Sequence, residues 1–278
     1  MPCPPLLSLP NYKKSLFKIL VIYLNFDMNM RKFLLAIIFI PNLIFSQVNP
    51  KVFKGVEKFY PKTLPIHLHI LTDKFGQTNV QMGNLNLMLN ELNEYFAPIG
   101  VDFQFCAVDT ILNNRLDSLI YLEKDIELVT KFNVKNKINL YLVADYLMSP
   151  VICGNASLGD TIVPTETVFR DAIFLNKPCT TQTRNIARLM GRYLGLNFTI
   201  GDGQELVDGS NCLTAGDRIC DTAADPGGSV NANCNLIGNP RDTNGDYYTP
   251  DVCNLMSLYT VGCQYHFSVQ QYNRMVEV

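Results

Sequence analysis

The chain has 278 residues, of which 47% are apolar and 17% charged, with 23 basic side chains against 25 acidic ones. Disorder requires low hydrophobicity and high net charge, so this composition excludes a wholly disordered chain. The net charge of -2 lacks the basic excess of a nucleic-acid-binding protein. No apolar run reaches the roughly 18 residues of a membrane-spanning helix, and nine cysteines are unusual for a cytosolic protein.

A short apolar segment near the N-terminus has the pattern of a secretory signal peptide. Arg31 and Lys32 precede the apolar run Phe33–Phe45, and a small residue follows it. The run is too short to span a bilayer, which argues against a membrane anchor. We therefore predict that residues 1–46 are an N-terminal extension and signal peptide. The start site stays open among Met1, Met28 and Met30.

The predicted mature chain, residues 47–278, is secreted or periplasmic on this interpretation, with no membrane contact once the signal is removed. Its composition changes along its length. Residues 199–278 carry three basic and ten acidic side chains, no lysine, and many Gly, Asn, Asp, Thr and Pro residues. This composition is typical of loops and turns. Because such a segment buries little apolar surface, we expect cross-links or bound cations to hold it.

Apolar periodicity predicts a mixed α/β fold for residues 47–198. In chain order we expect a strand at Pro65–Leu71, a helix at Met82–Phe96, strands at Val101–Val108, Ile138–Ala144 and Asp171–Leu175, and a helix at Thr181–Leu196. Gly195 stands where a helix C-terminus favours glycine. A last helix begins at Ser268, because Ser268 and Gln271 have the spacing of a capping box.

Two histidines, His67 and His69, lie two positions apart on the first predicted strand and so share one face of it. Such a pair is half of a zinc site, although a strand histidine pair is more often an ordinary edge or partly buried feature. His266 is the only other histidine of the chain.

Eight cysteines remain in the predicted mature chain, an even number that suits disulfide bonds in an exported protein. Four bridges allow 105 pairings, among which the sequence does not choose. The disulfide candidates are Cys106, Cys153, Cys179, Cys212, Cys220, Cys234, Cys253 and Cys263.

Residues 185–198, Asn-Ile-Ala-Arg-Leu-Met-Gly-Arg-Tyr-Leu-Gly-Leu-Asn-Phe, resemble the active-site helix of the metzincin zinc proteases, in particular the pappalysin or cytophagalysin family. The pattern of that family is H-E-x-x-H-x-x-G-x-x-H, whose histidines bind zinc and whose Glu is the general base. Downstream, Asn254-Leu-Met256-Ser resembles the Met-turn, and residues 267–275 resemble the closing helix. The resemblance implies a metzincin-like fold, a twisted mixed sheet with an active-site helix and a loop-rich C-terminal half.

The glycines and the methionine of this pattern are present, but its zinc ligands and its general base are replaced. Gly191, Gly195 and Met256 match the family's structural positions. The positions of the three zinc ligands, the general base and the tyrosine beyond the Met-turn are occupied by residues that perform none of these roles: Arg188, Arg192, Phe198, Leu189 and Leu258, respectively.

A guanidinium has no lone pair to offer a metal, and Leu and Phe offer neither ligand nor base. Two arginines one helical turn apart would also repel a dication. We therefore expect neither bound zinc nor zinc-dependent proteolysis. One interpretation is that Arg188 and Arg192 pair with nearby carboxylates, while Leu189 and Phe198 join the core.

The resemblance also implies a structural calcium ion near Asp217, Asp221 and Thr222, which coincide with a calcium-binding stretch of the family. Oxygen ligands on a loop suit calcium in an extracellular compartment. The alternative is that these are ordinary solvated loop residues.

The leading hypothesis is a secreted pseudoprotease that keeps the cleft of its family and binds a peptide or an extracellular protein without cutting it. An active zinc-dependent metalloendopeptidase is the alternative that family membership alone implies. A third interpretation is a relic scaffold whose cleft has no function.

Overall fold

The computed structural model of the chain describes residues 55–277 except 57–58, 120–121, 147–152 and 158–170. All of these residues lie in one compact unit, Val52–Val278. The predicted signal peptide, with its boundary after residue 46, lies outside the described residues. In the part of the chain that is described, no helix is both long enough and apolar enough to cross a membrane.

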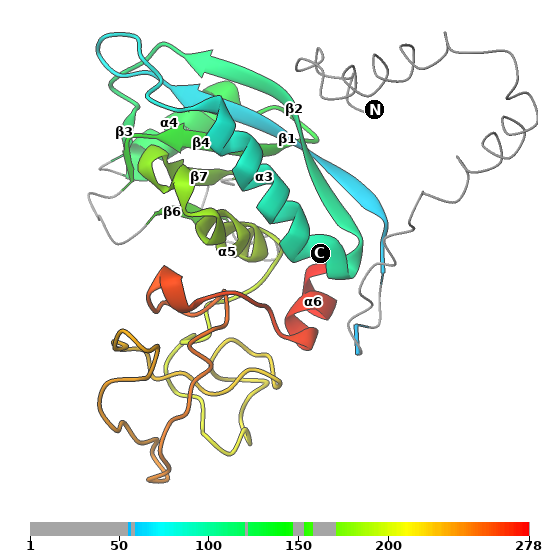
Figure 1. The fold of residues 1–278 in the computed structure, drawn as a ribbon, viewed down its shortest axis with the longest axis vertical. Coiled ribbons are helices and arrows are strands. Elements are labelled where there is room, and N and C mark those ends of the chain that lie inside the picture. The colour runs from blue at the N-terminus through cyan, green and yellow to red at the C-terminus, as the bar shows by residue number, and fades with distance from the viewer. Residues whose placement is uncertain (1–54, 57–58, 120–121, 147–152, 158–170, 278) are drawn as a thin grey trace, which may run out of the picture. The chain divides into compact units, whose positions relative to one another are not determined.

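A five-stranded mixed sheet forms the centre of the fold, in the order β2-β1-β4-β7-β6 (Figure 1). Its strands are β1 (Lys62–Leu71), β2 (Val101–Ile111), β4 (Ile138–Val143), β6 (Gly154–Ala156) and β7 (Ile173–Asn176). Neighbouring strands are parallel except for β6, which runs antiparallel to β7. A second, two-stranded parallel sheet joins β3 (Ser118–Leu119) and β5 (Asp145–Tyr146).

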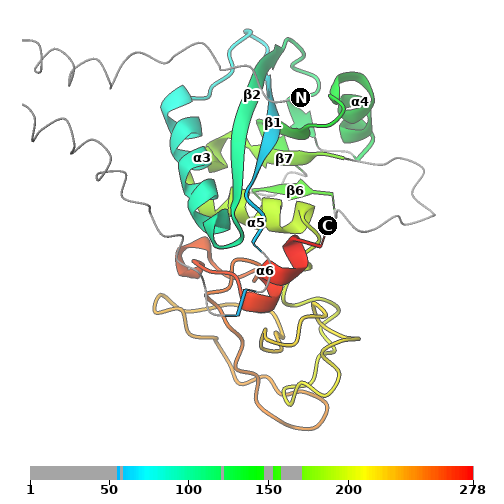
Figure 2. The same cartoon turned by 90° about the vertical axis from the view of Figure 1, so that its right-hand side faces the viewer.

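Helices cover both faces of the sheet (Figures 1 and 2). The helices are α3 (Met82–Phe96), α4 (Leu122–Phe132), α5 (Thr183–Tyr193) and α6 (Val269–Met275), with 3₁₀ turns at Ala97–Ile99, Lys177–Thr181 and Val261–Cys263. Helices α3 and α5 pack together on one face, and α4 covers the other. The predicted α/β class is therefore confirmed.

Two apolar clusters result from the alternation of side chains across the central strands. On β1, Ile66, Leu68 and Ile70 are buried beneath α3 and α5. Leu71 faces the opposite cluster, where Leu128 of α4 packs with strand residues. Both clusters need the strands to keep their register, because a slip of one residue would exchange the two faces.

The capping box predicted at the last helix is present. The Ser268 hydroxyl accepts a hydrogen bond from the Gln271 backbone N–H, and the Gln271 side-chain oxygen accepts one from the Ser268 backbone N–H. These bonds satisfy two of the N–H groups that a helix start leaves without partners. Helix α6 therefore begins at Val269, close to the predicted position.

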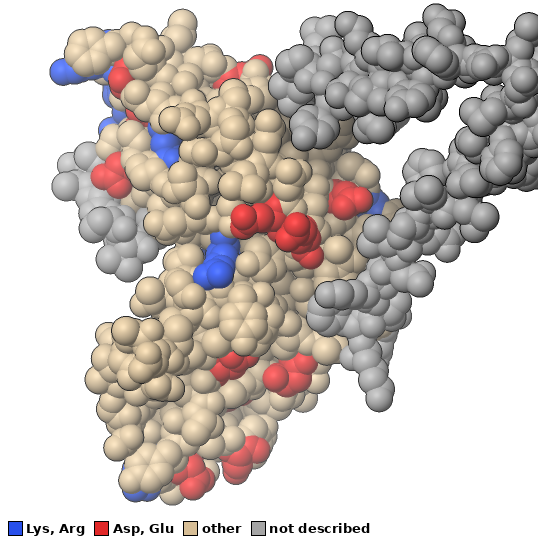
Figure 3. Space-filling view, in the orientation of Figure 1, with Lys and Arg blue, Asp and Glu red and all other residues tan. Residues whose placement is uncertain are grey.

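In the C-terminal half, residues 199–278, the chain before α6 consists mainly of turns and irregular structure, as its composition predicted. Figure 3 shows acidic groups spread over this half on the visible face. Disulfide bonds cross-link it: Cys212–Cys220 and Cys234–Cys263 lie within it, and Cys153–Cys179 ties β6 to the segment before α5. The prediction of disulfide bonds is therefore confirmed.

One cysteine departs from the predicted pairing. Cys253 is a free, partly buried thiol, whereas Cys106 is disulfide-bonded. The Cys253 carbonyl oxygen accepts a 2.9 Å hydrogen bond from the Tyr265 N–H. Cys263, ten positions along the chain, is already paired with Cys234. The expectation of a disulfide bond at Cys253 is wrong, because an even count does not oblige every cysteine to pair.

Candidate functional site

Helix α5 ends in a tight glycine turn that redirects the chain. The Gly195 N–H donates to the Arg192 carbonyl oxygen and the Leu196 N–H to the Gly191 carbonyl oxygen, both at 3.0 Å. This pair of bonds is a Schellman motif, which requires a left-handed residue after the helix. Gly195 supplies it with a φ of 89°. The predicted structural role of Gly195 is consistent with this geometry.

The turn at Met256 lies directly beneath α5. The Asn254 side-chain oxygen accepts a 2.8 Å bond from the Met256 N–H, and the Ser257 N–H closes the turn onto the Asn254 carbonyl oxygen. The Met256 carbonyl oxygen then accepts a bond from the Thr199 N–H at 3.1 Å, which joins the turn to the segment after α5. Helix, glycine turn and methionine turn thus form one unit.

A cavity of about 820 Å³ opens between α5 and this turn. Arg188 and Leu189 of α5, Phe198 and the segment 258–261 contribute to its wall. On the sheet side the wall includes Gly154 and Asn155 of β6 and Tyr146, and across the cavity the segment 228–230. Four of the five positions that the sequence marked as degenerate, Arg188, Leu189, Phe198 and Leu258, therefore line one cleft. Arg192 does not line it.

Arg188 places a buried cation in the wall of the cleft. The side chain is 9% exposed, and its Nη2 donates a 2.9 Å hydrogen bond to Oδ1 of Asn185. Burial lowers the pKa of Arg188, although a guanidinium stays protonated at neutral pH. Among the described residues no carboxylate lies within ion-pair distance of Arg188 and the Asn185 amide oxygen is its partner, so the pairing with nearby carboxylates stays a prediction.

Arg192 is held differently, one helical turn further on. Its guanidinium carbon lies 4.7 Å from the centre of the Phe198 ring, a cation–π contact. Its buried Nε has no hydrogen-bond partner. Among the described residues Arg192, too, forms no ion pair, and burial lowers its pKa. Arg192 and Phe198, which stand at the positions of the family's second and third zinc histidines, therefore pack against each other.

The zinc ion that the resemblance implies does not fit this donor set. Zinc sites are built from imidazole, thiolate and carboxylate groups. Here the cleft presents a guanidinium from Arg188, while Leu189 is 2% exposed and belongs to the apolar core, as predicted. Phe198 packs against the same core. These groups offer neither a metal ligand nor a base that could activate water.

Beyond the methionine turn, the chain presents Leu258 and buries Tyr259. The Leu258 side chain is 51% exposed at the cleft. The hydroxyl of Tyr259 donates a 2.7 Å hydrogen bond to Asp225, whose other oxygen accepts a bond from Thr199. Burial and the neighbouring Asp225 carboxylate raise the pKa of Tyr259. This tyrosine therefore ties the wall of the cleft to the chain behind it.

A second group of functional interest is acidic and lies in the C-terminal half. Asp217 is buried, and its Oδ1 accepts a 3.0 Å hydrogen bond from the Thr222 hydroxyl, whereas its Oδ2 has no partner. Glu205 is also buried and has an unpartnered Oε2. Glu205 is not among the residues predicted from the sequence; the signal available was an acidic residue within the turn-rich segment before Asp217.

Asp221, in contrast, does not share this arrangement. Its two oxygens accept bonds from the Ser268 hydroxyl at 2.6 Å and from the Gln270 N–H at 2.8 Å. It therefore stabilises the start of α6, where backbone N–H groups favour an anion. Asp217 and Thr222 are therefore hydrogen-bonded to each other, whereas Asp221 is bonded to the start of α6, and the calcium site at these three residues stays a prediction.

The buried carboxyl groups of Glu205 and Asp217 both ionise less readily than exposed ones. Burial raises the pKa of Glu205 to about 7, and the neighbouring Asp217 charge adds to the rise. Burial likewise raises the pKa of Asp217 to about 6. Each of these two buried carboxyl groups has a raised pKa and an oxygen without a hydrogen-bond partner. A hard cation such as calcium would stabilise their ionised forms.

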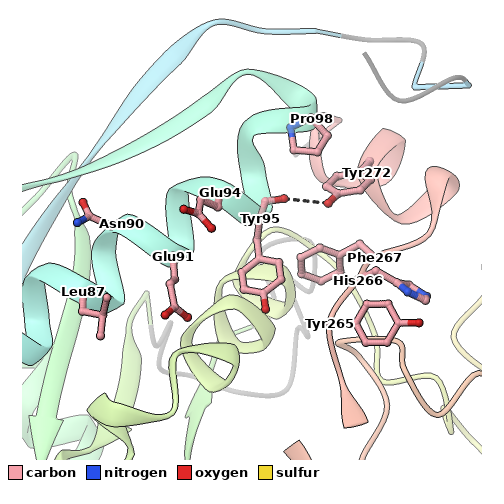
Figure 4. A pocket seen from close by; sticks show the side chains of 10 residues that line it. All are labelled: Leu87, Asn90, Glu91, Glu94, Tyr95, Pro98, Tyr265, His266, Phe267 and Tyr272. Carbon is pink, nitrogen blue, oxygen red and sulfur yellow. Dashed lines mark hydrogen bonds between the residues drawn. The ribbon is translucent and has the colours of Figure 1, made fainter. Parts of the chain in front are cut away.

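A separate pocket of about 580 Å³ lies between α3 and the segment leading into α6 (Figure 4). Glu91 and Glu94 of α3 line one side, and Tyr265 and Phe267 line the other. The Tyr272 hydroxyl donates a 2.9 Å bond to the Tyr95 carbonyl oxygen at one end. Since this bond joins α6 to α3, we assign the pocket to the packing of these two helices.

The sheet, helix α5 with its glycine turn and the methionine turn beneath it form an α/β fold that is similar to those of solved metalloproteases. In particular, the fold is similar to that of Tannerella forsythia mature mirolysin in complex with a cleaved peptide, with a TM-score of 0.58 and 13% identity over 78% of this chain and 90% of that chain. A mutant of Tannerella forsythia promirolysin gives a TM-score of 0.54 and 15% identity over 80% and 81%. No family model and no curated protein sequence matches the chain.

Proposed function

We propose that this chain is an inactive homologue of the pappalysin-type metalloproteases, which binds an extended peptide in its cleft and does not cleave it. The observation that carries the proposal is Arg188, a buried guanidinium in the cleft wall with an amide but no described carboxylate as its partner. Because a guanidinium has five N–H donors, Arg188 retains donors for an anionic group of a ligand.

The edge of the sheet supports an extended ligand. Strand β6 pairs with β7 on one side only, and no described strand pairs with its outer edge. Gly154 and Asn155 of β6 line the cleft. An extended peptide can add to such an edge through its backbone N–H and C=O groups, while pockets select its side chains. The exposed Leu258 and the apolar Phe198 suit an apolar side chain of the peptide, next to the anionic group that Arg188 would bind.

The acidic group of the C-terminal half supports a calcium ion in a structural role. The residues that would hold it are Glu205, Asp217 and Thr222, which offer two carboxylates and a hydroxyl. When bound, calcium would supply a positive charge that allows both carboxylates to ionise in the folded chain. Three disulfide bonds among the described residues also support export, because disulfide bonds form and persist in oxidising compartments outside the cytosol.

Peptide binding is tested with two sets of fluorescent peptides that differ only by Glu in one set and Gln in the other. The wild-type chain should bind the Glu set at least tenfold more tightly, and Arg188→Gln should remove this preference. Arg192→Gln is the matched control, because Arg192 lies on the same helix outside the cleft wall. Equal affinity for both sets, or the same loss in both variants, would contradict the proposal.

The active-enzyme alternative gives a different result in the same assay. Peptides incubated with the chain and zinc would then appear as fragments in mass spectrometry, and a chelator would stop their formation. The relic-scaffold interpretation gives neither fragments nor binding.

A further inference from the structure

An irregularity between β1 and β2 brings three side chains of metal-ligating type together, on the sheet face opposite α5. The parallel pairing shifts by one residue between Ile66 and His67: Ile66 lies opposite Phe105, but His67 lies opposite Ala107. Cys106 is thereby skipped. Beyond this bulge His69 lies opposite Asp109. Without it, Asp109 would lie opposite Ile70 and would face the apolar cluster beneath α3 and α5.

The three side chains are close enough to share one ion. One ligand atom from each of His67, His69 and Asp109 lies within 4.8 Å of the other two. His67 Nε2 is 2.5 Å from Asp109 Oδ2, and the two histidine rings stack with their centres 4.4 Å apart. A bulge re-aims side chains in this manner and is common at functional sites.

The neighbouring amide of Asn139 fixes which nitrogen of His69 carries a proton. Asn139 Nδ2 donates to the carbonyl oxygens of Val134 and Lys137, and its Oδ1 accepts a 2.8 Å bond from the Val134 N–H. Oδ1 is therefore an acceptor, and His69 Nε2, 3.2 Å away, must be the donor. The proton of the neutral ring is on Nε2.

His69 Nδ1 consequently has a free lone pair. The side chain is fully buried, and this nitrogen has no hydrogen-bond partner. An amide oxygen that holds one ring nitrogen while the other is free is the arrangement that orients histidine ligands in metal sites. Tyr141 supports the ring from behind, with centres 4.4 Å apart.

We propose that His67, His69 and Asp109 bind one divalent transition-metal ion of the zinc class. Two imidazoles and one carboxylate are a common set of three protein ligands, with water in the fourth position. Ligand distances of about 2.0–2.2 Å place tetrahedral ligand atoms about 3.4 Å apart. The ion would therefore draw the three groups together, and the Asp109 side chain, 56% exposed, is free to move.

The site would clamp the edge strand β2 to its neighbour β1. β2 is the outermost strand of the sheet, paired only with β1 among the described strands. The ion would join ligands from both strands at a point just beyond the bulge, where the regular ladder is interrupted. This site is independent of the cleft, because Ile66, Leu68 and Ile70 of β1 separate it from α5.

The experiment titrates zinc into chelator-treated protein by calorimetry, with excess calcium present to occupy the acidic group of the C-terminal half. The wild-type chain should take up one equivalent. Asp109→Asn and His67→Gln should each bind zinc at least tenfold more weakly. Asp102→Asn is the matched control, because Asp102 is an exposed aspartate on the same strand, and it should bind as the wild type does.

Cobalt provides a second measurement on the same variants. One equivalent of Co²⁺ should give visible absorption bands of a four-coordinate site in the wild type and in Asp102→Asn, and these bands should be lost in Asp109→Asn. Circular dichroism checks that each variant is folded. No uptake by the wild type, or uptake that both Asp109→Asn and His67→Gln leave unchanged, would overturn the proposal.

Discussion

Gly191 lies against Met256 so closely that a side chain has no room between them. A Cβ added at Gly191 would be 3.1 Å from the Met256 sulfur and 3.0 Å from the Phe267 ring. The backbone of the helix that lines the cleft therefore packs directly against the Met256 side chain of the turn beneath it. The chain keeps this close packing although the residues on the open side of the helix offer no metal ligand.

Gly191→Ala should destabilise the protein by about 1 kcal/mol. Alanine gains about 1 kcal/mol in helix propensity over glycine, but crowding in a packed core costs about 1–3 kcal/mol. Gly83→Ala is the control, because Gly83 lies in α3 with no atom within 4 Å of an added Cβ. Denaturant unfolding of both variants checks this, and an increase in stability for Gly191→Ala would contradict the packing described.

The buried ion pair between Lys177 and Asp117 should be costly to break. Lys177 Nζ lies 2.6 Å from Asp117 Oδ1, and both side chains are less than a tenth exposed. Asp117→Asn leaves an uncompensated buried ammonium and should cost about 3–5 kcal/mol. Lys131→Gln, which breaks an exposed pair with Glu127, should cost less than about 1 kcal/mol. Similar losses in the two variants would contradict the difference in burial.

The Cys234–Cys263 disulfide bond should contribute more to stability than the free thiol of Cys253 does. Replacing Cys234 and Cys263 by alanine opens a connection between residues 29 positions apart and should cost about 3 kcal/mol. Cys253→Ser removes a free thiol and should cost less than about 1 kcal/mol. Thermal unfolding checks both. A large loss in Cys253→Ser would mean that this thiol is bonded in the protein.

The contribution of Glu205 and Asp217 to the stability of the calcium-free protein should fall as the pH rises from about 4 to about 7. The folded-state pKa of Glu205 is raised from 4.5 to about 7 and that of Asp217 from 3.8 to about 6. Both raised values mean that the folded chain holds its protons to a higher pH than the unfolded chain does. Their stabilising effect is complete below the unfolded values and is lost as the pH passes through the folded ones.

Calcium should reverse this loss, by about 1 kcal/mol or roughly 2–4 °C in the melting temperature at neutral pH. Glu205→Gln should flatten the pH dependence and abolish the response to calcium, because it removes one of the two carboxylates. Melting curves at several pH values, with chelator and with calcium, check this. A wild-type stability that does not fall relative to that of Glu205→Gln over the same pH range without calcium would contradict the pKa directions.

Periodicity located most of the elements on which the cleft depends. Met82–Phe96 was predicted to the residue because its apolar spacing and the following Pro98 define both face and end. Helix α4, Leu122–Phe132, was missed, since it is amphipathic but rich in charged residues. The two-residue strands β3 and β5 are too short to leave any pattern in the sequence.

The sequence predicted which residues meet at the cleft, but not the hydrogen-bond partners of those residues. The spacing of Arg188, Leu189 and Phe198 placed them at one site because a helix and its glycine turn fix their directions. The partner of Arg188 depends on side-chain rotamers, and among the described residues it proved to be Asn185, three positions earlier on the same helix. The sharing of one face by His67 and His69 followed from strand geometry, whereas Asp109 reached them only through a bulge that leaves no sequence signal.

The most direct test of the central claim is a cleavage assay on the purified chain with a denatured protein and a mixture of peptides as substrates. Zinc and calcium are both supplied in excess, and Asp109→Asn is included so that zinc on the sheet is not mistaken for zinc in the cleft. The account predicts intact substrates by mass spectrometry in every sample, with Glu-containing peptides bound and recovered whole. Cleavage that a chelator abolishes and that Arg188→Gln alters would contradict it.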